Sequence, residues 1–296
     1  QTMNATLSSG SLPVMRVHYA EILCQLAEER GVRRSDLVSV AGIRNSQLSH
    51  PDNFITLDQF TALCQQALTR CGDECLGLEY GKRLKFTAHG ALSQAAISCD
   101  TLEQALAVLI KYFRIRFAYM SPAFFVEDED AVIQLEIHHD TEKLHRFNIE
   151  VVMATLMDVN YLLFGTQLLD GGRCLVDYPR PEDVERYQYL FGGKVTFSAG
   201  VNQLRFRKSF LGLPMSLSNP VARRVAEAQC EEEMRQMEAS ASVSDRVLRL
   251  LESARDGRLP GLEDVAQQMG VSPRTLRRQL SAEGGGFHGL QESVRH

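Results

Sequence analysis

The chain has 296 residues, 44% of them hydrophobic, which is enough for about two domains with buried cores. Its net charge of −5 at pH 7 excludes a protein whose whole surface attracts nucleic acid, so any contact with a polyanion must be local. We find no stretch near the ~18 apolar residues that a membrane span needs, and no signal-peptide pattern at the N-terminus. Together with an odd number of cysteines, seven, this predicts a protein of the reducing cytoplasm.

Residues 14 to about 115 are predicted to be almost wholly helical. Tyr19, Ile22 and Leu23 begin an apolar stripe at helical spacing, and a glycine at position 31 ends it. Thr56 and Thr101 each stand at the start of a further apolar pattern, where a threonine caps a helix.

Three cysteines, Cys64, Cys71 and Cys75, lie close together in this helical region. Their spacing allows a metal or redox site. Cys64, however, falls within an apolar helical pattern, and free cysteine commonly behaves as a small core residue. We therefore expect core packing, with no metal and no cofactor.

The pattern changes after residue 117. Residues 117–126 are aromatic and rich in strand formers, residues 127–130 are a polar turn, and residues 131–137 alternate, so a hairpin is expected. A helix around 146–164 follows. Short strands are predicted at 173–178, 194–197 and 203–207, with a helix near 181–190. Residues 14–215 are thus predicted to form an α+β domain with a helical front and a small mixed sheet.

A long polar helix is predicted from Val221 to about Glu238. Val225, Ala228 and Met234 form a thin apolar stripe on it. The helix either pairs with its copy in a homodimer or docks on its own domain, and the sequence leaves both open. Residues 220–243 are the expected linker, because small residues break the pattern at 239–244.

The segment at 262–280 predicts a helix, a tight turn and a second helix within an all-α unit at 244–296. Ser272 is a good N-cap for the second helix. Arg274, Arg277 and Arg278 fall on its outer face, the surface that such a motif places in a DNA major groove. We predict that these arginines, with Ser272 and Thr275, bind double-stranded DNA. The alternative is an ordinary helical hairpin with a solvated face.

Charge supports a local DNA contact. Residues 244–296 hold eight Arg against seven Asp plus Glu, a balance of +1, so the rest of the chain carries about −6. The basic excess lies mostly at 273–280, within the predicted second helix.

No enzyme is expected. The sequence contains no Gly-rich phosphate loop, no G-x-S-x-G motif and no metal-binding helix motif. His138, His139 and Asp140, with His145 nearby, have side chains that ligate metals. The simpler interpretation, which we favour, is a polar and solvated end of the hairpin.

A small-molecule site needs an apolar pocket with a few orienting polar groups. We expect it between the helical front and the hairpin, contacted by Tyr112, Arg114, Arg116, Tyr119 and Phe125. Arg114 or Arg116, turned inward, would bind a ligand carboxylate. The alternative is that these aromatic side chains belong to the core.

Several segments resemble transcription regulators of the AraC/XylS family. At the C-terminal end they are residues 262–266, 269–280 and 283–287; at the front they are residues 77–84, 89–92, 189–197, 202–206 and 210–214. The front is similar to the effector-binding domain of one branch of that family. The resemblance implies a regulator that senses a small-molecule effector and binds operator DNA.

The resemblance also implies two helix-turn-helix units joined by a helix. The chain stops at His296, within the start of that joining helix, so we expect an incomplete DNA-binding domain that holds only the first unit. The rival interpretation is a ligand-binding or interaction module that does not read DNA. A hydrolase or isomerase in the α+β domain is a weaker third.

Overall fold

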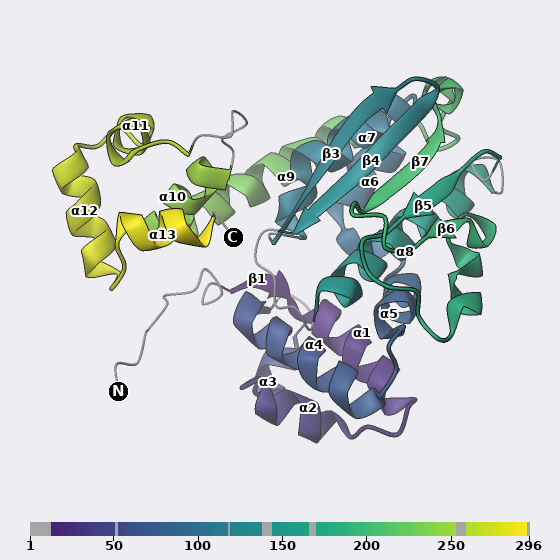
Figure 1. Cartoon of the computed structure of the whole chain (residues 1–296), viewed down its shortest axis with the longest axis horizontal. Coiled ribbons are helices and arrows are strands. Elements are labelled where there is room, and N and C mark those ends of the chain that lie inside the picture. Colours follow the sequence, from purple (N-terminus) through teal and green to yellow (C-terminus); the bar gives the residue numbers. More distant parts are fainter. Residues whose placement is uncertain are drawn as a thin grey trace.

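The N-terminal part of the molecule combines a group of helices with a small sheet (Figure 1). The computed structural model describes residues 13–50, 53–117, 119–137, 144–165, 170–252 and 259–294. The front is mainly helical, as the sequence predicts. Its helices are α1 (Val17–Glu28), α2 (Arg34–Val40), α3 (Asn45–Leu48), α4 (Leu57–Cys71), α5 (Leu76–Leu84), α6 (Ala91–Ile97) and α7 (Leu102–Tyr112).

Local capping signals set the ends of these helices. The Thr56 hydroxyl accepts a hydrogen bond from the Gln59 N–H at 3.1 Å, and the Gln59 side chain accepts one from the Thr56 N–H. Gly72 ends α4 with a left-handed φ of 60°. Thr101 caps α7 by accepting from the Gln104 N–H at 3.4 Å. Both predicted threonine caps are confirmed.

Two short strands interrupt the helical front, and the sequence did not predict them. β1 (Pro13–Arg16) pairs antiparallel with β2 (Phe54–Thr56). Strands of this length carry no readable period. Each runs directly into a helix, α1 and α4 respectively, and those two helices pack together. The pairing therefore fixes where both helices begin.

The sheet has five strands in the order β3-β4-β7-β5-β6. The strands are β3 (Met120–Glu127), β4 (Asp130–Ile137), β5 (Arg173–Leu175), β6 (Val195–Thr196) and β7 (Gln203–Arg207). Neighbouring strands are antiparallel except β5 and β6, which are parallel. The predicted hairpin and small mixed sheet are confirmed.

The segment predicted as a helix at 181–190 is a short 3₁₀ helix, η5 (Val184–Tyr189). Tyr187 and Leu190 are both buried, and the Leu190 N–H donates to the Tyr187 carbonyl oxygen at 2.8 Å. A 3₁₀ turn brings residues three apart to the same side. Burial of these two side chains therefore favours the tighter turn.

Helix α8 (His145–Phe164) packs closely against α5. Gly77 and Gly81 lie four residues apart, on one face of α5. A Cβ atom at Gly77 would lie 2.5 Å from the Phe147 carbonyl oxygen, and one at Gly81 would lie 2.6 Å from the Val151 carbonyl oxygen. At these positions the two backbones approach as closely as only glycine allows.

Among the described helices, α8 alone is long and apolar enough to cross a membrane. However, 56% of its apolar window is buried inside the protein. Glu150, in its second turn, is fully buried and accepts hydrogen bonds from the Leu78 N–H and the Tyr187 hydroxyl. These are the properties of a helix in the core of a folded domain.

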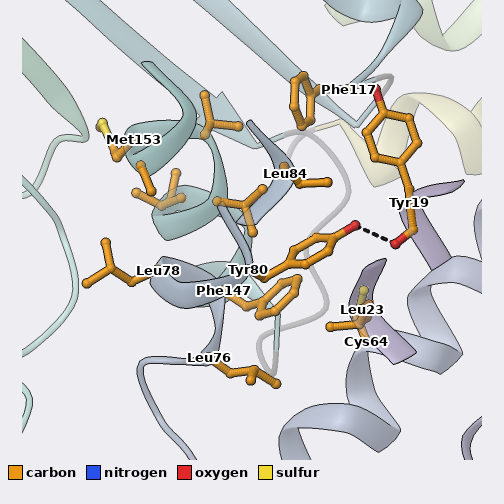
Figure 2. Close-up of a cluster of buried hydrophobic side chains, with 14 of the residues drawn as sticks. Tyr19, Leu23, Cys64, Leu76, Leu78, Tyr80, Leu84, Phe117, Phe147 and Met153 are labelled. Atoms are coloured by element: carbon orange, nitrogen blue, oxygen red, sulfur yellow. Dashed lines mark hydrogen bonds between the residues drawn. The ribbon is translucent and has the colours of Figure 1, made fainter. Parts of the chain in front are cut away.

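Figure 2 shows the core where the front helices meet α8. The buried Tyr80 donates a hydrogen bond from its hydroxyl to the Tyr19 carbonyl oxygen at 2.8 Å. Its ring stacks on Phe147 with the centroids 5.8 Å apart. Leu23 and Cys64 belong to the same cluster. Cys64 is thus a core residue, as predicted.

In the part of the chain that the structure describes, five helices follow the sheet: α9 (Pro220–Ser240), α10 (Val243–Glu252), α11 (Leu262–Gln268), α12 (Pro273–Ala282) and α13 (Phe287–Ser293). Figure 1 shows α9 leading from beside α6 and α7 to α10, with α11 to α13 grouped beyond it. These last helices have an apolar cluster of their own. Its buried members are Val247, Leu251, Leu262, Val265, Ala266, Leu276 and Leu280.

A side chain at Gly81 should destabilise the fold. In Gly81→Ala the methyl group meets the α8 backbone, so we expect the unfolding free energy to fall by about 1–3 kcal/mol despite the higher helix propensity of alanine. Urea unfolding followed by circular dichroism measures this change. In the control Gly212→Ala the new Cβ meets nothing within 4 Å, and stability should change by less than about 0.5 kcal/mol. Equal stabilities for the two variants would contradict the close approach of the helices.

Candidate functional site

A tight turn joins α11 to α12, and its residues explain its geometry. Gly270 adopts a left-handed φ of 68° just after α11. The Ser272 hydroxyl accepts a hydrogen bond from the Thr275 N–H at 3.1 Å, and Pro273 takes the first helical position. The Ser272 and Thr275 hydroxyls are also 2.8 Å apart. The start of α12 is thus well defined.

One side of α12 is buried and the other is basic. Leu276 and Leu280 are fully buried at i and i+4. Arg274, Arg277 and Arg278 are exposed, and none has a hydrogen-bond or ion-pair partner in the part of the chain that the structure describes. Guanidinium groups match phosphate oxygens and guanine edges. This side of α12 is therefore suited to bind a nucleic acid.

Glu283 ties the end of α12 to the start of α10. Its carboxylate accepts hydrogen bonds from the Val243 and Ser244 N–H groups at 2.7 and 2.8 Å and from the Ser244 hydroxyl at 2.6 Å. Partial burial acts to raise the pKa of Glu283, but these hydrogen bonds outweigh it and the pKa lies below its usual value. The charged carboxylate also faces the positive end of the α10 dipole. The two helices are held as one unit.

The residues predicted to contact a small molecule lie in three places. Tyr112, Arg114 and Arg116 turn toward α9 and contact it. Tyr119 is buried in the core of the front. Phe125 lies on β3 and is 37% exposed. The structure brings the first three together and separates the other two from them, and their role as ligand contacts stays a prediction.

A set of polar contacts, here called the α9 clasp, fastens α9 to the N-terminal part of the chain. It consists of Lys111, Tyr112, Arg114 and Arg116, which pair with Glu231, Glu233 and Glu238 of α9. Lys111 and Tyr112 both donate to the Glu231 carboxylate, at 2.6 and 2.7 Å. The Lys111–Glu231 pair is more than half exposed, so solvent screens it and it contributes little to the attachment of α9.

Arg116 is the buried member of the α9 clasp, with 5% of its surface exposed. Its Nη1 atom donates to Glu233 at 2.6 Å, and its Nε atom donates to the His89 carbonyl oxygen at 3.0 Å. The Glu233 side chain is itself only 15% exposed. Breaking such a pair is costly, because the buried Arg116 loses its charged partner and Glu233 keeps only a longer ion pair, with Arg16 at 3.9 Å, in the part of the chain that the structure describes. Arg116 is therefore the main anchor of α9.

An apolar seam lies along the same side of α9. Ala226 and Cys230 are buried, and Met234 packs against the same cluster. Glu233 lies seven residues after Ala226, so the seam and the buried ion pair share one face of the helix. Of the predicted stripe only Met234 packs along this seam, because Val225 and Ala228 are exposed. Pairing with Arg116 sets the rotation of α9, and the sequence alone does not reveal that rotation.

His89 lies buried beside Arg116. Its Nδ1 atom is hydrogen-bonded to the Tyr19 hydroxyl at 2.8 Å, and its buried Nε2 atom has no partner among the described residues. Burial, with the positive charge of Arg116, lowers the pKa of His89 to about 3. The imidazole is therefore neutral at pH 7.

A cavity of about 60 Å³ lies among α6, α7, α8 and the sheet. Its lining includes Leu106 of α7, Met157 of α8 and Ile133 of β4, and every lining residue except Asn160 is apolar. Asn160 is 5% exposed, and neither atom of its amide has a hydrogen-bond partner in the described part of the chain. The cavity lies in the expected region, but other residues than the predicted ones line it.

Three residues of the histidine cluster, His138, His139 and Asp140, fall outside the described residues. His145 is described, and its Nε2 atom lies 2.9 Å from both carboxylate oxygens of Asp177. Over the ranges that the structure describes, no three or more His, Cys, Asp or Glu side chains are grouped to hold a metal.

Sequence reasoning missed three features of this region, and two of them had a signal in the sequence. Glu231 and Glu233 belong to an acidic run that complements the basic run at 111–116. Asn160 is a polar residue within an otherwise apolar stretch of α8. Glu283 follows α12 closely, but its partners are about forty residues away, so only the fold reveals its role.

Comparison with known proteins adds an independent finding. Residues 31–215 match the family described as the arabinose-binding domain at the N-terminus of AraC transcription regulators. The chain is similar to the ornithine utilization regulator of Pseudomonas aeruginosa, with 33% identity over 279 residues that cover 94% of this chain and 82% of that protein.

Two further proteins are similar to the chain. An uncharacterized HTH-type transcriptional regulator of Mycobacterium tuberculosis is 27% identical over 286 residues, covering 94% of this chain and 82% of its own length. The crystal structure of the transcriptional regulator CdpR from Pseudomonas aeruginosa aligns with a TM-score of 0.48 at 20% identity, covering 88% of this chain and 81% of that chain.

Acid should weaken the fold through His89. Its pKa is 6.5 in a model peptide and about 3 in the folded protein, so between these values only the unfolded chain binds the proton. The stability due to neutral His89 is present above pH ~6.5 and is lost as the pH falls toward 3. In His89→Gln, the slope of unfolding free energy against pH between about pH 6 and 4 should fall by up to ~1.4 kcal/mol per pH unit. Urea titrations at several pH values measure it, and equal slopes would contradict it.

Proposed function

Because the chain belongs to the family of AraC transcription regulators and carries their arabinose-binding-type N-terminal domain, we propose that α11 and α12 form a helix-turn-helix that reads operator DNA and that α9 links it to the effector. The protein is a small-molecule-responsive transcription regulator, and the proposal concerns the residues that perform each step. One observation carries it: the exposed arginines of α12, which have no partner among the described residues, stand opposite its buried leucines.

The proposed DNA contact uses the outer side of α12. Arg274, Arg277 and Arg278 approach the base edges of a major groove, where arginine pairs with guanine O6 and N7. Ser272 and Thr275 stand at the N-terminus of α12, where hydroxyl and N–H groups position a phosphate. The low net charge of the whole chain restricts the contact to this helix and its surroundings.

We assign three roles along the chain, which acts in the cytoplasm. Residues 14–215 bind the effector, residues 244–296 bind DNA, and residues 220–243 connect these two parts. Two facts support these boundaries. The family match ends at residue 215, and the last helices bury an apolar cluster that is separate from the clusters of the N-terminal part.

The α9 clasp is the proposed link between effector and DNA. The cluster on which the apolar seam of α9 packs shares residues with the cavity lining, among them Phe86, Leu109 and Met215. A ligand that changes the packing of these residues changes the surface on which α9 rests. For regulation, the ligand has to bind two arrangements of α9 with different affinity.

Ornithine fits this chain poorly as an effector, although the name of one relative refers to ornithine utilization. Ornithine bears charged groups, and burying them requires charged partners. None of the residues that line the described cavity is charged, and Arg114 and Arg116 are already paired with α9. An effector of another chemical class suits this chain better.

A homodimer stays a prediction. Val221 and Val225 are 61% and 67% exposed, on the side of α9 that faces away from the buried Ala226. Sedimentation at high micromolar concentration tests it, and a strict monomer with and without DNA would remove the dimer from the proposal.

Removing the arginines of α12 should weaken DNA binding. If Arg274→Ala, Arg277→Ala or Arg278→Ala abolishes a guanine contact, operator discrimination should fall by about 1–3 kcal/mol. If the substitution abolishes a phosphate contact, the salt slope should fall by about one. Fluorescence anisotropy with a site selected by the protein from random DNA measures both. Thermal stability should not fall, because the side chains are exposed.

The control is Arg33→Ala, which removes the same charge from the surface of the N-terminal part, where the Arg33 side chain is 80% exposed. It should leave operator affinity and salt slope unchanged. If all three α12 variants also bind like the wild type, the rival function, a module that does not read DNA, replaces this proposal.

Breaking the buried pair should loosen α9. In Arg116→Met and Glu233→Gln, we expect amide hydrogen exchange in residues 226–234 to accelerate at least tenfold, because exchange follows local opening. Mass spectrometry of exchanged peptides measures it. The control is Glu232→Gln, which removes only interactions within its own helix, with Arg235 and Gln236. Equal acceleration in the control variant would contradict an anchoring role for Arg116.

A further inference from the structure

We infer that the apolar cavity is the effector site and that it takes a small, neutral, largely apolar molecule whose single polar group, an amide or a hydroxyl, hydrogen-bonds to Asn160. The inference rests on the proposed function, in which the N-terminal domain is the sensor. It goes further by naming the site and the chemistry of the ligand.

Asn160 is the observation that points to a ligand. Its side chain is buried in α8 at the edge of an apolar cavity, and both its amide nitrogen and its amide oxygen lack a partner in the part of the chain that the structure describes. Buried polar groups are nearly always hydrogen-bonded. Thr155, on the same helix, follows this rule, because its hydroxyl donates to the Val151 carbonyl oxygen at 2.8 Å. Asn160 has no such bond within its helix.

The chemistry of the lining selects a neutral ligand. Apart from Asn160, the residues that line the cavity are aliphatic, aromatic or methionine side chains. A carboxylate or an ammonium group placed there would lose its hydration without gaining an opposite charge. A sugar would leave most of its hydroxyl groups without partners for the same reason.

The nitrogen and the oxygen of the Asn160 amide determine which polar group the ligand needs. The amide nitrogen is a donor and the amide oxygen is an acceptor. A ligand carboxamide offers both complements side by side, and a hydroxyl group offers both on one atom. A carbonyl group alone would leave the Asn160 oxygen unpaired.

The cavity volume sets the size. A water-sized atom needs about 10–15 Å³ of such space, so the 60 Å³ of the cavity holds roughly four to six non-hydrogen atoms. Met157 and Met215 also line it, and their unbranched side chains adapt easily to a longer ligand. A four-carbon amide is therefore a suitable first probe.

The position of the cavity suits an effector. Met215 and Phe86 belong both to its lining and to the cluster against which Ala226 and Cys230 of α9 pack. A ligand that fills the cavity therefore acts on the cluster against which α9 packs, because Phe86 and Met215 belong to both.

The test uses the full chain with ¹³C-labelled methionine methyl groups and the probe butanamide. We expect butanamide to shift the methyl signals of Met157 and Met215 and to leave those of Met15 and Met269 unchanged, since neither of these two lines the cavity. Butanoate and butylammonium, which have the same chain length but carry a charge, should bind at least tenfold more weakly. Binding of all three with equal affinity, or shifts confined to other methionines, would overturn the inference.

Two variants test Asn160 itself. Asn160→Leu should reduce butanamide affinity at least tenfold while keeping the affinity for cyclopentane, which shows that the cavity persists. Thr155→Val, also a buried polar residue of α8, should leave butanamide affinity unchanged. Unchanged butanamide affinity in Asn160→Leu would overturn the inference.

The readout is independent of DNA, so the two proposals fail separately. A negative result here removes the ligand assignment and leaves the tests of α12 and the α9 clasp as they stand. A protein that binds butanamide through Asn160 but does not bind DNA would instead overturn the proposed function.

Discussion

The close approach of α5 and α8 is the constraint on which the N-terminal domain depends. Gly77 and Gly81 let the backbones meet, and the Leu78 N–H then donates to the buried Glu150 carboxylate at 3.1 Å. Burial raises the pKa of Glu150, and the Arg146 guanidinium at 2.7 Å gives the carboxylate a charged partner. This packing joins the front helices to the helix that covers the sheet. It also fixes the rotation of α8. That rotation determines where side chains about three turns further along point, among them Asn160 at the cavity.

The sequence was sufficient where local signals determine structure. The threonine caps, the hairpin, α8, α9 and the turn before α12 each depend on residues that are close together in the sequence, and all appear where expected. The β1–β2 pair and the 3₁₀ helix η5 were missed, because both depend on residues that are far apart in the sequence. β1 and β2 are about forty residues apart and form strands only by pairing with each other. In η5, the surrounding fold buries Tyr187 and Leu190. Propensity within a short window carries no information about such pairings.

The same division holds for the candidate sites. The outward direction of Arg274, Arg277 and Arg278 follows from helical spacing against Leu276 and Leu280, so the sequence alone predicts it. The run at 112–119 was harder to interpret. Its aromatic and basic residues suit a ligand pocket and an interface equally well, and only the acidic face of α9, more than one hundred residues later, decides between them for Arg114 and Arg116. Charge pairs between residues so far apart cannot be predicted from the sequence of one helix alone.

The hydrogen bonds of Glu283 have a mechanical consequence. Because the carboxylate after α12 holds the first residues of α10, motion delivered to the start of α10 reaches α12 without being absorbed in between. α9 has 21 residues and is therefore about 30 Å long. If α9 tilts by about five degrees about its N-terminal end, where the Asn219 N–H donates to the Ser98 carbonyl oxygen at 3.0 Å, its far end moves by roughly 3 Å. That is about the length of one hydrogen bond, the scale on which a side chain either reaches a base edge in a DNA groove or falls short of it.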